Sequence, residues 1–305
     1  MTATGATGRY APSPTGTLHL GNLRTALLAW LFARSQDAAF ILRIDDLDAS
    51  RARPGLAEAQ LEDLAALGLD WDGPVVRQSE RHALYEAAIA RLDADGLLYP
   101  CYCTRAEIRA AASAPHGALP EGAYPGTCRE LTAAERIERE RAGRPPALRL
   151  RAREAVVSFT DRLLGAHSAA VDDLVVRRHD GAAAYNLAVV VDDSAQGIEE
   201  IVRGADLLET TPRQLHVRAL LAGPPVTHAH VPLVLGPDGA RLAKRHGAVT
   251  LADRAASGQS PLEVRSQLAE SVGLAAPGEQ PSLEELLARF DPDGLPREPT
   301  VLTAS

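Results

Sequence analysis

A short motif near the amino terminus, His19-Leu20-Gly21-Asn22, has the residue types of a phosphate-binding helix start. It follows a Pro-rich turn, Pro12-Ser13-Pro14-Thr15-Gly16, and opens an apolar stretch that predicts a helix over residues 20–34. Backbone N–H groups at a helix start attract a phosphate, His19 and Asn22 could donate hydrogen bonds, and Gly21 would allow close approach. Four residues alone describe an ordinary helix start equally well.

A basic motif far along the chain, Arg241-Leu242-Ala243-Lys244-Arg245, offers a second group for phosphate chemistry. A mobile lysine such as Lys244 can screen the negative charge of a triphosphate in a crowded, anionic transition state. Taken alone, Lys244 is equally well explained as a solvated lysine on a surface loop.

The three cysteines of the chain all lie between positions 101 and 128, an odd number that does not suggest a disulfide framework. Cys101, Cys103 and Cys128, together with Tyr124, offer three thiolates and a phenolate that fit a tetrahedral zinc site. Such a site would be closed and structural. The alternatives are three buried or free thiols, and His116 in place of Tyr124 as the fourth ligand.

The elements that must position these residues alternate between strand and helix. Residues 9–11 and 40–44 read as strands on either side of the predicted helix, and leucine spacing predicts packing helices between residues 56 and 98. Residues 147–150 and the apolar run 187–191 read as further strands, the latter as a buried parallel one. An α/β fold with a parallel sheet follows, with ligands beyond the carboxyl ends of its strands.

The composition of the chain limits the classes of protein to which it can belong. The 305 residues are 46% hydrophobic and carry a net charge of -8, so any contact with nucleic acid must be local. No apolar run is long enough to span a bilayer, and the first residues lack the pattern of a signal peptide. A protein that resides in the cytoplasm, away from membranes, is therefore expected.

Taken together, three motifs resemble the class I aminoacyl-tRNA synthetases of the glutamyl type. These are residues 9–22, Leu42-Arg43-Ile44-Asp45-Asp46-Leu47-Asp48 and residues 241–245, the first two similar to the HIGH-type signature and the third to the KMSKS-type loop. The resemblance implies a Rossmann-like catalytic domain split into residues 8–100 and 147–250. It also implies that His19, Gly21, Asn22 and Lys244 bind ATP, with Mg²⁺ on the phosphates, and that His19, Asn22 and Lys244 are catalytic.

The same resemblance implies a glutamate site. Arg9 and Arg203 would bind the carboxylates, Ser13 and Asp45 the ammonium, and Tyr185 would shape the pocket. Two positions depart from the family pattern, because Asp45 replaces the usual glutamate and Ala243 replaces a serine that would donate a hydroxyl to the phosphates. A lone arginine is more often part of a structural ion pair. Here both Arg9 and Arg203 match positions of the family pattern, which favours a role in substrate binding.

The cysteine arrangement and residues 184–193 are most similar to the short branch of this family, which transfers glutamate to queuosine in the anticodon of tRNA(Asp). By this resemblance residues 101–146 form a zinc-binding insertion and residues 251–305 form a short helical segment, with no anticodon-binding domain. Within that segment, a capping-box pattern at Ser282 predicts a short helix to about Phe290. ATP, glutamate and queuosine-bearing tRNA(Asp) would be the substrates of a monomer. The alternatives are a truncated glutamyl-tRNA synthetase that charges the tRNA 3′ end and a non-catalytic glutamate- or RNA-binding paralogue.

Overall fold

A computed structural model describes residues 5–48, 52–104, 106–108, 123–143, 145–240, 242, 247 and 249–301. A seven-stranded sheet in the order β3-β2-β1-β9-β10-β6-β7 forms its centre. Neighbouring strands run parallel from β3 to β6, and the edge pair β6/β7 is antiparallel. The strands are β1 (Gly8–Tyr10), β2 (Phe40–Ile44), β3 (Val76–Arg77), β6 (Val156–Asp161), β7 (Gly165–Ala170), β9 (Glu200–Gly204) and β10 (Thr227–Val231). The expected α/β fold with a parallel sheet is confirmed.

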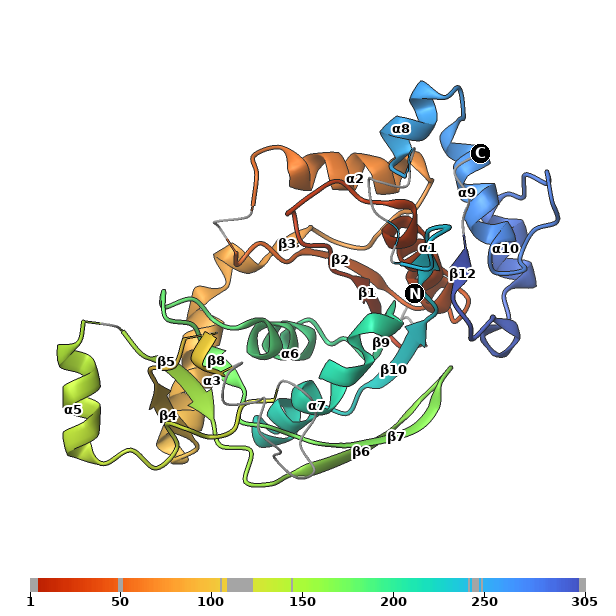
Figure 1. Cartoon of the computed structure of the whole chain (residues 1–305). Coiled ribbons are helices and arrows are strands. Elements are labelled where there is room, and N and C mark those ends of the chain that lie inside the picture. Colours follow the sequence, from red (N-terminus) through yellow and green to blue (C-terminus); the bar gives the residue numbers. More distant parts are fainter. Residues whose placement is uncertain are drawn as a thin grey trace.

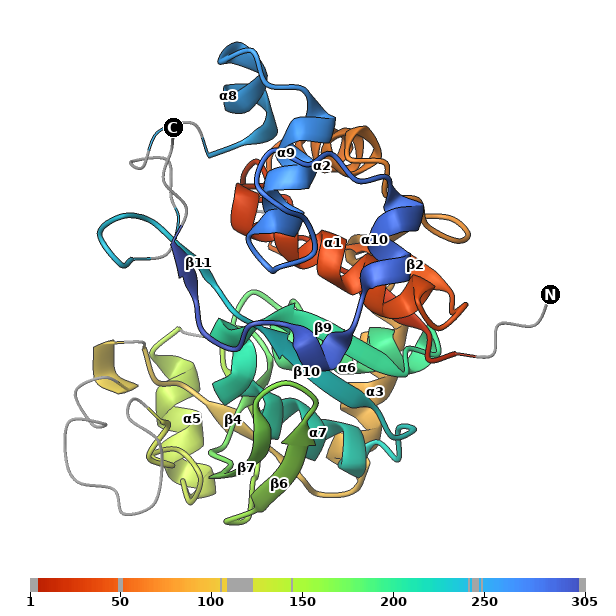
Figure 2. The same ribbon diagram turned by 90° about the vertical axis from the view of Figure 1, so that its right-hand side faces the viewer.

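Helices cover both faces of this sheet (Figures 1 and 2). The helix α1 (Leu20–Arg34) and residues of the carboxyl-terminal helices share one hydrophobic core, and a second core lies around α3 and α6. The other helices in this region are α2 (Leu56–Ala66), α3 (His82–Ala94), α6 (Tyr185–Ala195) and α7 (Thr211–Leu220), with short 3-10 helices η1 (Gln78–Glu80) and η2 (Ala205–Thr210). The bounds predicted for α1 and β2 match the structure.

The strand predicted over residues 187–191 is wrong, because these residues form the middle of α6. A short continuous apolar run does not distinguish a buried strand from a buried helix. Leu187, Ala188, Val189 and Val190 are all buried in the core beside the sheet, so this part of the helix shows little alternation of polar and apolar residues. The strands that instead complete the sheet are β9 and β10, and neither was predicted.

A separate antiparallel sheet in the order β4-β5-β8 holds the segment from residue 101 to residue 146. Its strands are β4 (Leu98–Cys101), β5 (Ala147–Leu150) and β8 (Val175–Arg177). Residues 147–150 thus form the predicted strand but pair outside the main sheet. Cys101 lies opposite Ala147 in the β4/β5 ladder, so the chain leaves this small sheet and returns to it at adjacent positions.

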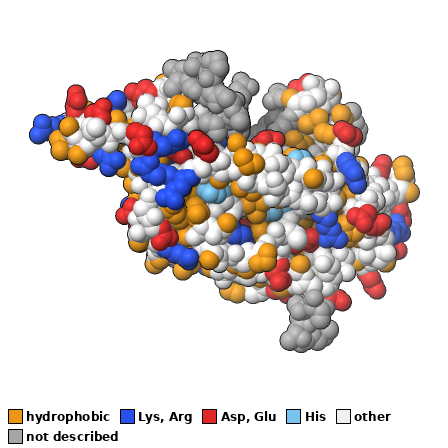
Figure 3. Space-filling view, turned by 90° about the horizontal axis from the view of Figure 1, so that it is seen from below, with side chains coloured by type: hydrophobic (Ala, Val, Ile, Leu, Met, Phe, Trp, Pro, Cys, Tyr) orange, Lys and Arg blue, Asp and Glu red, His pale blue; other side chains and the backbone are white. Residues whose placement is uncertain are grey.

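Within the insertion, α5 (Ala133–Arg141) begins with a capping box at Thr132 and buries none of its residues. It projects from the body of the molecule in Figure 1. In Figure 3 basic and acidic side chains are interspersed on this projecting end, which agrees with the alternating charges of its sequence. The helix therefore has no single-sign surface.

The carboxyl-terminal region consists of α8 (Leu251–Ala256), α9 (Pro261–Glu270), α10 (Leu283–Arg289), η4 (Pro292–Gly294) and β12 (Thr300–Val301). The capping box predicted at Ser282 is present, since Ser282 Oγ accepts from the Glu285 N–H. The strand β12 pairs in parallel with β11 (Val234–Leu235). No helix among the residues described here is long and apolar enough to cross a membrane.

Candidate active site and metal centre

A cavity of about 420 Å³ opens beyond the carboxyl ends of β1, β2 and β9. The strand β1 stands between β2 and β9, where the chain order of the sheet reverses, and such switch points are the usual ligand sites of open α/β sheets. Eight of the predicted substrate residues line the cavity: Arg9, Ser13, His19, Gly21, Asn22, Asp45, Tyr185 and Arg203. Residues separated by almost 200 positions are thus brought to one site.

His19 is the N-cap of α1, and its side chain has a fixed role there. Its Nδ1 accepts from the Asn22 N–H at 3.3 Å, and Asn22 Oδ1 accepts from the His19 N–H at 3.2 Å, which completes a capping box. With Nδ1 used as an acceptor, the neutral imidazole carries its proton on Nε2. The positive end of the helix dipole and the His19 side chain therefore both lie at the cavity.

Gly21 packs so closely against His19 and Val234 that there is no room for a side chain, which the sequence did not reveal. A Cβ at this position would lie 3.0 Å from His19 Cε1 and 3.4 Å from Val234 Cβ. Any side chain would press on the His19 ring and disturb the cap. The glycine thus keeps the helix start open, in addition to its predicted part in ATP binding.

Four buried charged side chains form a compact ion-pair network at the floor of the cavity. Arg9 binds both carboxylate oxygens of Asp193 at 3.3 Å, and Arg43 binds Asp193 and Asp45 at 2.7 Å each. Burial alone would raise the pKa of Asp193, but Arg9 and Arg43 hold it well below its usual range. Burial raises the pKa of Asp45 to about 6, against the opposing charge of Arg43.

Arg203 differs from Arg9 because its side-chain partners are neutral. It donates to His230 Nε2 at 3.0 Å, to Gln214 Oε1 at 2.6 Å and to Thr211 Oγ1 at 2.8 Å. Within the described part of the chain no ion pair involves Arg203. Burial lowers its pKa to about 10, so it remains charged at neutral pH and provides an uncompensated cation in the cavity wall.

The remaining predicted substrate residues lie at the mouth of the cavity. Tyr185, the first residue of α6, is 45% exposed, and Ser13 is exposed on the loop after β1. Gln60 of α2 fixes this loop by donating to the carbonyl oxygens of Ser13 and Gly16 at 3.1 and 2.7 Å. The loop is thus held by a glutamine to which the sequence had given no role.

Arg43 and Asp193 were not recognised as site residues from the sequence. Arg43 lies within the second motif and Asp193 is the last of residues 184–193, and neither is among the residues with a predicted function. A charged residue inside the apolar strand 40–44 is the signal that could have identified Arg43, which is fully buried and lines the cavity. Asp193 has no comparable signal, because its partner Arg9 is 184 positions away.

Lys244, the predicted mobile cation, lies outside the described residues, as do Ala243 and Arg245. The described residues on either side are anchored next to the cavity. Leu242 N–H donates to the carbonyl oxygen of Val234, and Leu20 N–H donates to that of Val249, beside the helix start. The role of Lys244 stays a prediction.

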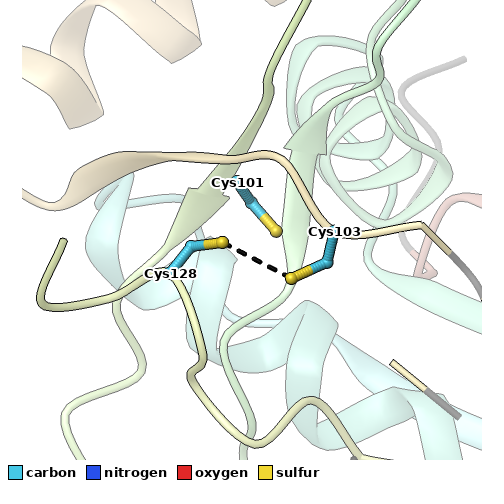
Figure 4. Close-up of side chains that lie close together, drawn as sticks. All are labelled: Cys101, Cys103 and Cys128. Carbon is cyan, nitrogen blue, oxygen red and sulfur yellow. Dashed lines mark hydrogen bonds between the residues drawn. The ribbon is translucent and has the colours of Figure 1, made fainter. Parts of the chain in front are cut away.

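The three cysteines converge, as Figure 4 shows, from the end of β4 and from the segment before α5. All three are buried, and their sulfur atoms lie within 4.8 Å of one another. Cys103 Sγ is 3.4 Å from Cys128 Sγ, while the Tyr124 hydroxyl oxygen is 3.4 Å from Cys101 Sγ and 3.8 Å from Cys103 Sγ. No disulfide joins them.

This donor set fits a tetrahedral zinc ion. Zinc–sulfur bonds of about 2.3 Å place two thiolates of a tetrahedron about 3.8 Å apart, close to the separations found here. Arg149 lies 3.6 Å above the Tyr124 ring, where its charge would offset the excess negative charge of three thiolates if they held a divalent cation. The cluster could therefore hold a metal ion, with Tyr124 within reach as the fourth ligand. The alternative ligand, His116, is not among the described residues.

Comparison with known proteins agrees with this geometry. A family model described as the catalytic domain of class I tRNA synthetases (E and Q) matches residues 6–278. A glutamyl-Q tRNA(Asp) synthetase from Nocardia farcinica is 60% identical over 98% of this chain and 94% of its own length. The chain belongs to the glutamyl-Q tRNA(Asp) synthetase family. A second member, from Symbiobacterium thermophilum, is 53% identical over 97% of this chain and 96% of its own length.

Solved structures place this glutamyl-Q tRNA(Asp) synthetase family member beside glutamate-tRNA ligases. A glutamate tRNA ligase from Elizabethkingia meningosepticum, in complex with its amino acid, superimposes with a TM-score of 0.83 at 27% identity. The match covers 98% of this chain and 67% of the ligase. The enzyme from Elizabethkingia anophelis gives a TM-score of 0.82 over 68% of its length. The expected class I synthetase fold is confirmed.

Proposed function

We propose that this protein activates glutamate with ATP, without tRNA, and transfers it to the queuosine base at the wobble position of tRNA(Asp). The observation that carries the activation step is the single cavity that holds both the start of α1 and the uncompensated cation Arg203. The acceptor is proposed from the names of the relatives that match nearly the whole chain.

In the proposed glutamate site, Arg203 is the main carboxylate ligand. Arg203 donates three of its five N–H groups to neutral side chains, which leaves one N–H on each terminal nitrogen, enough for a carboxylate. Arg9 is already neutralised by both oxygens of Asp193, so it contributes less net charge. Asp45 and Ser13 would bind the ammonium, and Tyr185 would cover the bound amino acid.

In the proposed activation step, one oxygen of the glutamate α-carboxylate attacks the α-phosphorus of ATP and pyrophosphate leaves. The start of α1 would hold phosphate oxygens through the Gly21 N–H, the positive end of the helix dipole and the side chains of His19 and Asn22. Lys244 and Mg²⁺ would offset the charge that develops on the triphosphate. In the second step a queuosine hydroxyl attacks the mixed anhydride, an ester forms and AMP leaves.

The proposed metal is zinc, held by Cys101, Cys103, Cys128 and Tyr124 in a structural role. It would tie the end of β4 to the segment before α5. The proposed units remain residues 8–100 and 147–250 for catalysis, 101–146 for the insertion and 251–305 for the helical segment. ATP and tRNA as substrates favour the cytoplasm, and a monomer stays a prediction.

The test is glutamate labelling of purified tRNA(Asp) with and without queuosine. We expect label only in the queuosine-bearing tRNA. After nuclease cleavage of the labelled tRNA, we expect that label in the fragment that holds the anticodon loop and not in the fragment that holds the 3′ end. Equal labelling of unmodified tRNA at its 3′ end would instead indicate a truncated glutamyl-tRNA synthetase. No glutamate-dependent exchange of pyrophosphate into ATP would indicate a non-catalytic paralogue.

A further inference from the structure

Three neighbouring strands each contribute one residue to a chain of hydrogen bonds behind the cavity. Arg203 of β9 is the register partner of His230 on β10, and Asp161 ends the next strand, β6. Arg203 Nε donates to His230 Nε2 at 3.0 Å, and His230 Nδ1 lies 2.6 Å from Asp161 Oδ2. The cavity wall is thus connected to the interior of the sheet through one imidazole.

The contacts of His230 fix the position of its proton. Because Arg203 can only donate, Nε2 must accept, so the neutral ring carries its proton on Nδ1 and donates it to Asp161. Asp161 is held as an acceptor by the backbone N–H groups of Leu163 and Leu164 at 3.0 Å and of His230 at 3.2 Å. The carboxylate therefore orients the ring for Arg203.

Neither Asp161 nor His230 lines the cavity, and both side chains are fully buried. A ligand in the cavity could not touch them without a rearrangement. Among the described residues, His230 Nε2 contacts Arg203 and Thr211, and Arg203 is the one of these two that lines the cavity. His230 holds the Nε of Arg203, while the terminal nitrogens keep N–H groups for a ligand. Without that contact the guanidinium would keep its hydrogen bonds to Gln214 and Thr211 at the terminal nitrogens but would lose the one that fixes its Nε.

We propose that Asp161 and His230 are positioning residues for glutamate recognition: they hold the Arg203 guanidinium in the orientation that receives the substrate carboxylate. This inference rests on the proposed function, because it takes glutamate as the ligand of Arg203. The pair orients the arginine without a direct ion pair, because His230 stands between the guanidinium and the Asp161 carboxylate. Glutamate affinity should therefore depend on His230 much more than ATP affinity does.

The test compares His230→Phe with His228→Phe in glutamate-dependent exchange of pyrophosphate into ATP. His228 is a matched control, since it lies on the same strand, is equally buried and stacks on His230, with ring centroids 5.9 Å apart, but makes no hydrogen bond to Arg203. Loss of one hydrogen bond to a charged group lowers binding affinity about 10- to 100-fold. H230F should therefore raise the KM for glutamate by at least about tenfold. H228F should change it by less than about threefold, as expected of a packing substitution that removes no such bond.

The KM for ATP and kcat should change little in H230F, and thermal unfolding of both variants should be compared. Equal effects of H230F and H228F, or equal changes in the KM values for glutamate and ATP, would show a merely structural role and overturn the proposal. If wild-type protein shows no glutamate-dependent exchange, the proposed function itself fails. If the wild type is active but H230F changes the KM values for glutamate and ATP equally, the positioning role of His230 fails while the proposed function stands.

A second pair of variants decides the matter if H230F does not fold. In His230→Gln the amide oxygen reaches about the position of Nε2 and can still accept from Arg203. In His230→Asn the shorter amide reaches only toward Asp161. H230Q should retain a KM for glutamate within about threefold of wild type, whereas H230N should resemble loss of the contact. The reverse order would contradict the proposal.

Discussion

At the scale of single residues, charge balance determines what each group in the cavity can do. Arg9, Arg43, Asp45 and Asp193 form a network that compensates its own charges, and it is fully buried. Such a network contributes shape and orientation more than net attraction. Arg203 is bound by neutral acceptors and so retains its charge for a ligand. Two arginines that look alike in the sequence thus have different electrostatic roles.

We expect glutamate binding to depend on pH through Asp45. Its pKa is raised to about 6 by burial, so the carboxylate that would bind the substrate ammonium is lost as the pH falls through 6. The KM for glutamate should therefore rise about fourfold between pH 8 and pH 5.5, following the ionised fraction. Exchange of pyrophosphate into ATP, measured across this range, gives the profile.

The control for this profile is Asp45→Asn, which cannot ionise at that position. Its KM for glutamate should be high and nearly flat over the same range, and the KM for ATP should show no such trend in either protein. A wild-type profile without a rise toward low pH, or a parallel rise in D45N, would mean that Asp45 does not control ammonium binding.

At the scale of elements, the cysteine cluster joins parts of the insertion whose described residues form little apolar core of their own. The helix α5 buries none of its residues, and the buried side chains nearby are Tyr99, Tyr102, Tyr124 and the three cysteines. A segment with so few apolar contacts needs another source of stability. In small structural units a bound metal ion often provides it. Loss of zinc should therefore destabilise the insertion directly and affect the cavity only indirectly.

Metal analysis tests the ligand set. Purified wild-type protein should contain about one zinc per chain, and Cys101→Ser should contain almost none, because three ligands hold a structural zinc poorly. Tyr124→Phe should lower zinc affinity if the phenolate is the fourth ligand. Tyr102→Phe is the matched control, since Tyr102 is buried in the same cluster but its hydroxyl donates to Glu140.

Equal, near-zero zinc in wild type and C101S would rule out the site. Unchanged zinc affinity in Y124F, with loss of zinc in C101S, would keep the cysteines as ligands and exclude the tyrosine.

At the scale of the whole molecule, the carboxyl-terminal region packs against the helix that begins at the cavity. Phe32 of α1 and Phe290 make an edge-to-face contact at 5.2 Å. Arg24, fully buried in α1, donates to the carbonyl oxygen of Pro232 at 2.6 Å and to Ser271 Oγ at 3.3 Å. One side chain therefore connects α1, the cavity wall at Pro232 and the residue that follows α9.

Arg24→Met should lower the free energy of unfolding by about 1–3 kcal/mol, because it leaves a buried carbonyl group unsatisfied. Urea denaturation followed by circular dichroism measures the change. The control is Arg91→Met, since Arg91 of α3 donates to one carbonyl oxygen, that of Leu221, at the surface. That variant should change stability by less than about 0.5 kcal/mol. Similar losses in the two variants would show that Arg24 is not a special connection.

The sequence by itself determined the local features of this protein. The bounds of α1, the strand 40–44 and the capping box at Ser282 follow from apolar periodicity and helix-start chemistry, which act over a few residues. The predicted substrate residues and the cysteine set were identified from motifs. Those predicted substrate residues that the structure describes all line one cavity. The apolar run in α6 was misread, because periodicity does not separate a buried helix from a buried strand.

Only the tertiary structure decided which charges compensate each other. Asp193 neutralises Arg9 from 184 positions away, and His230 and Asp161 meet Arg203 across three strands whose order the sequence does not reveal. Electrostatic and hydrogen-bond contacts act over a few ångströms in space, whatever the separation along the chain. The residue types showed that arginines were available, and the fold determined that Arg9 is paired with a carboxylate while Arg203 is bound by neutral side chains.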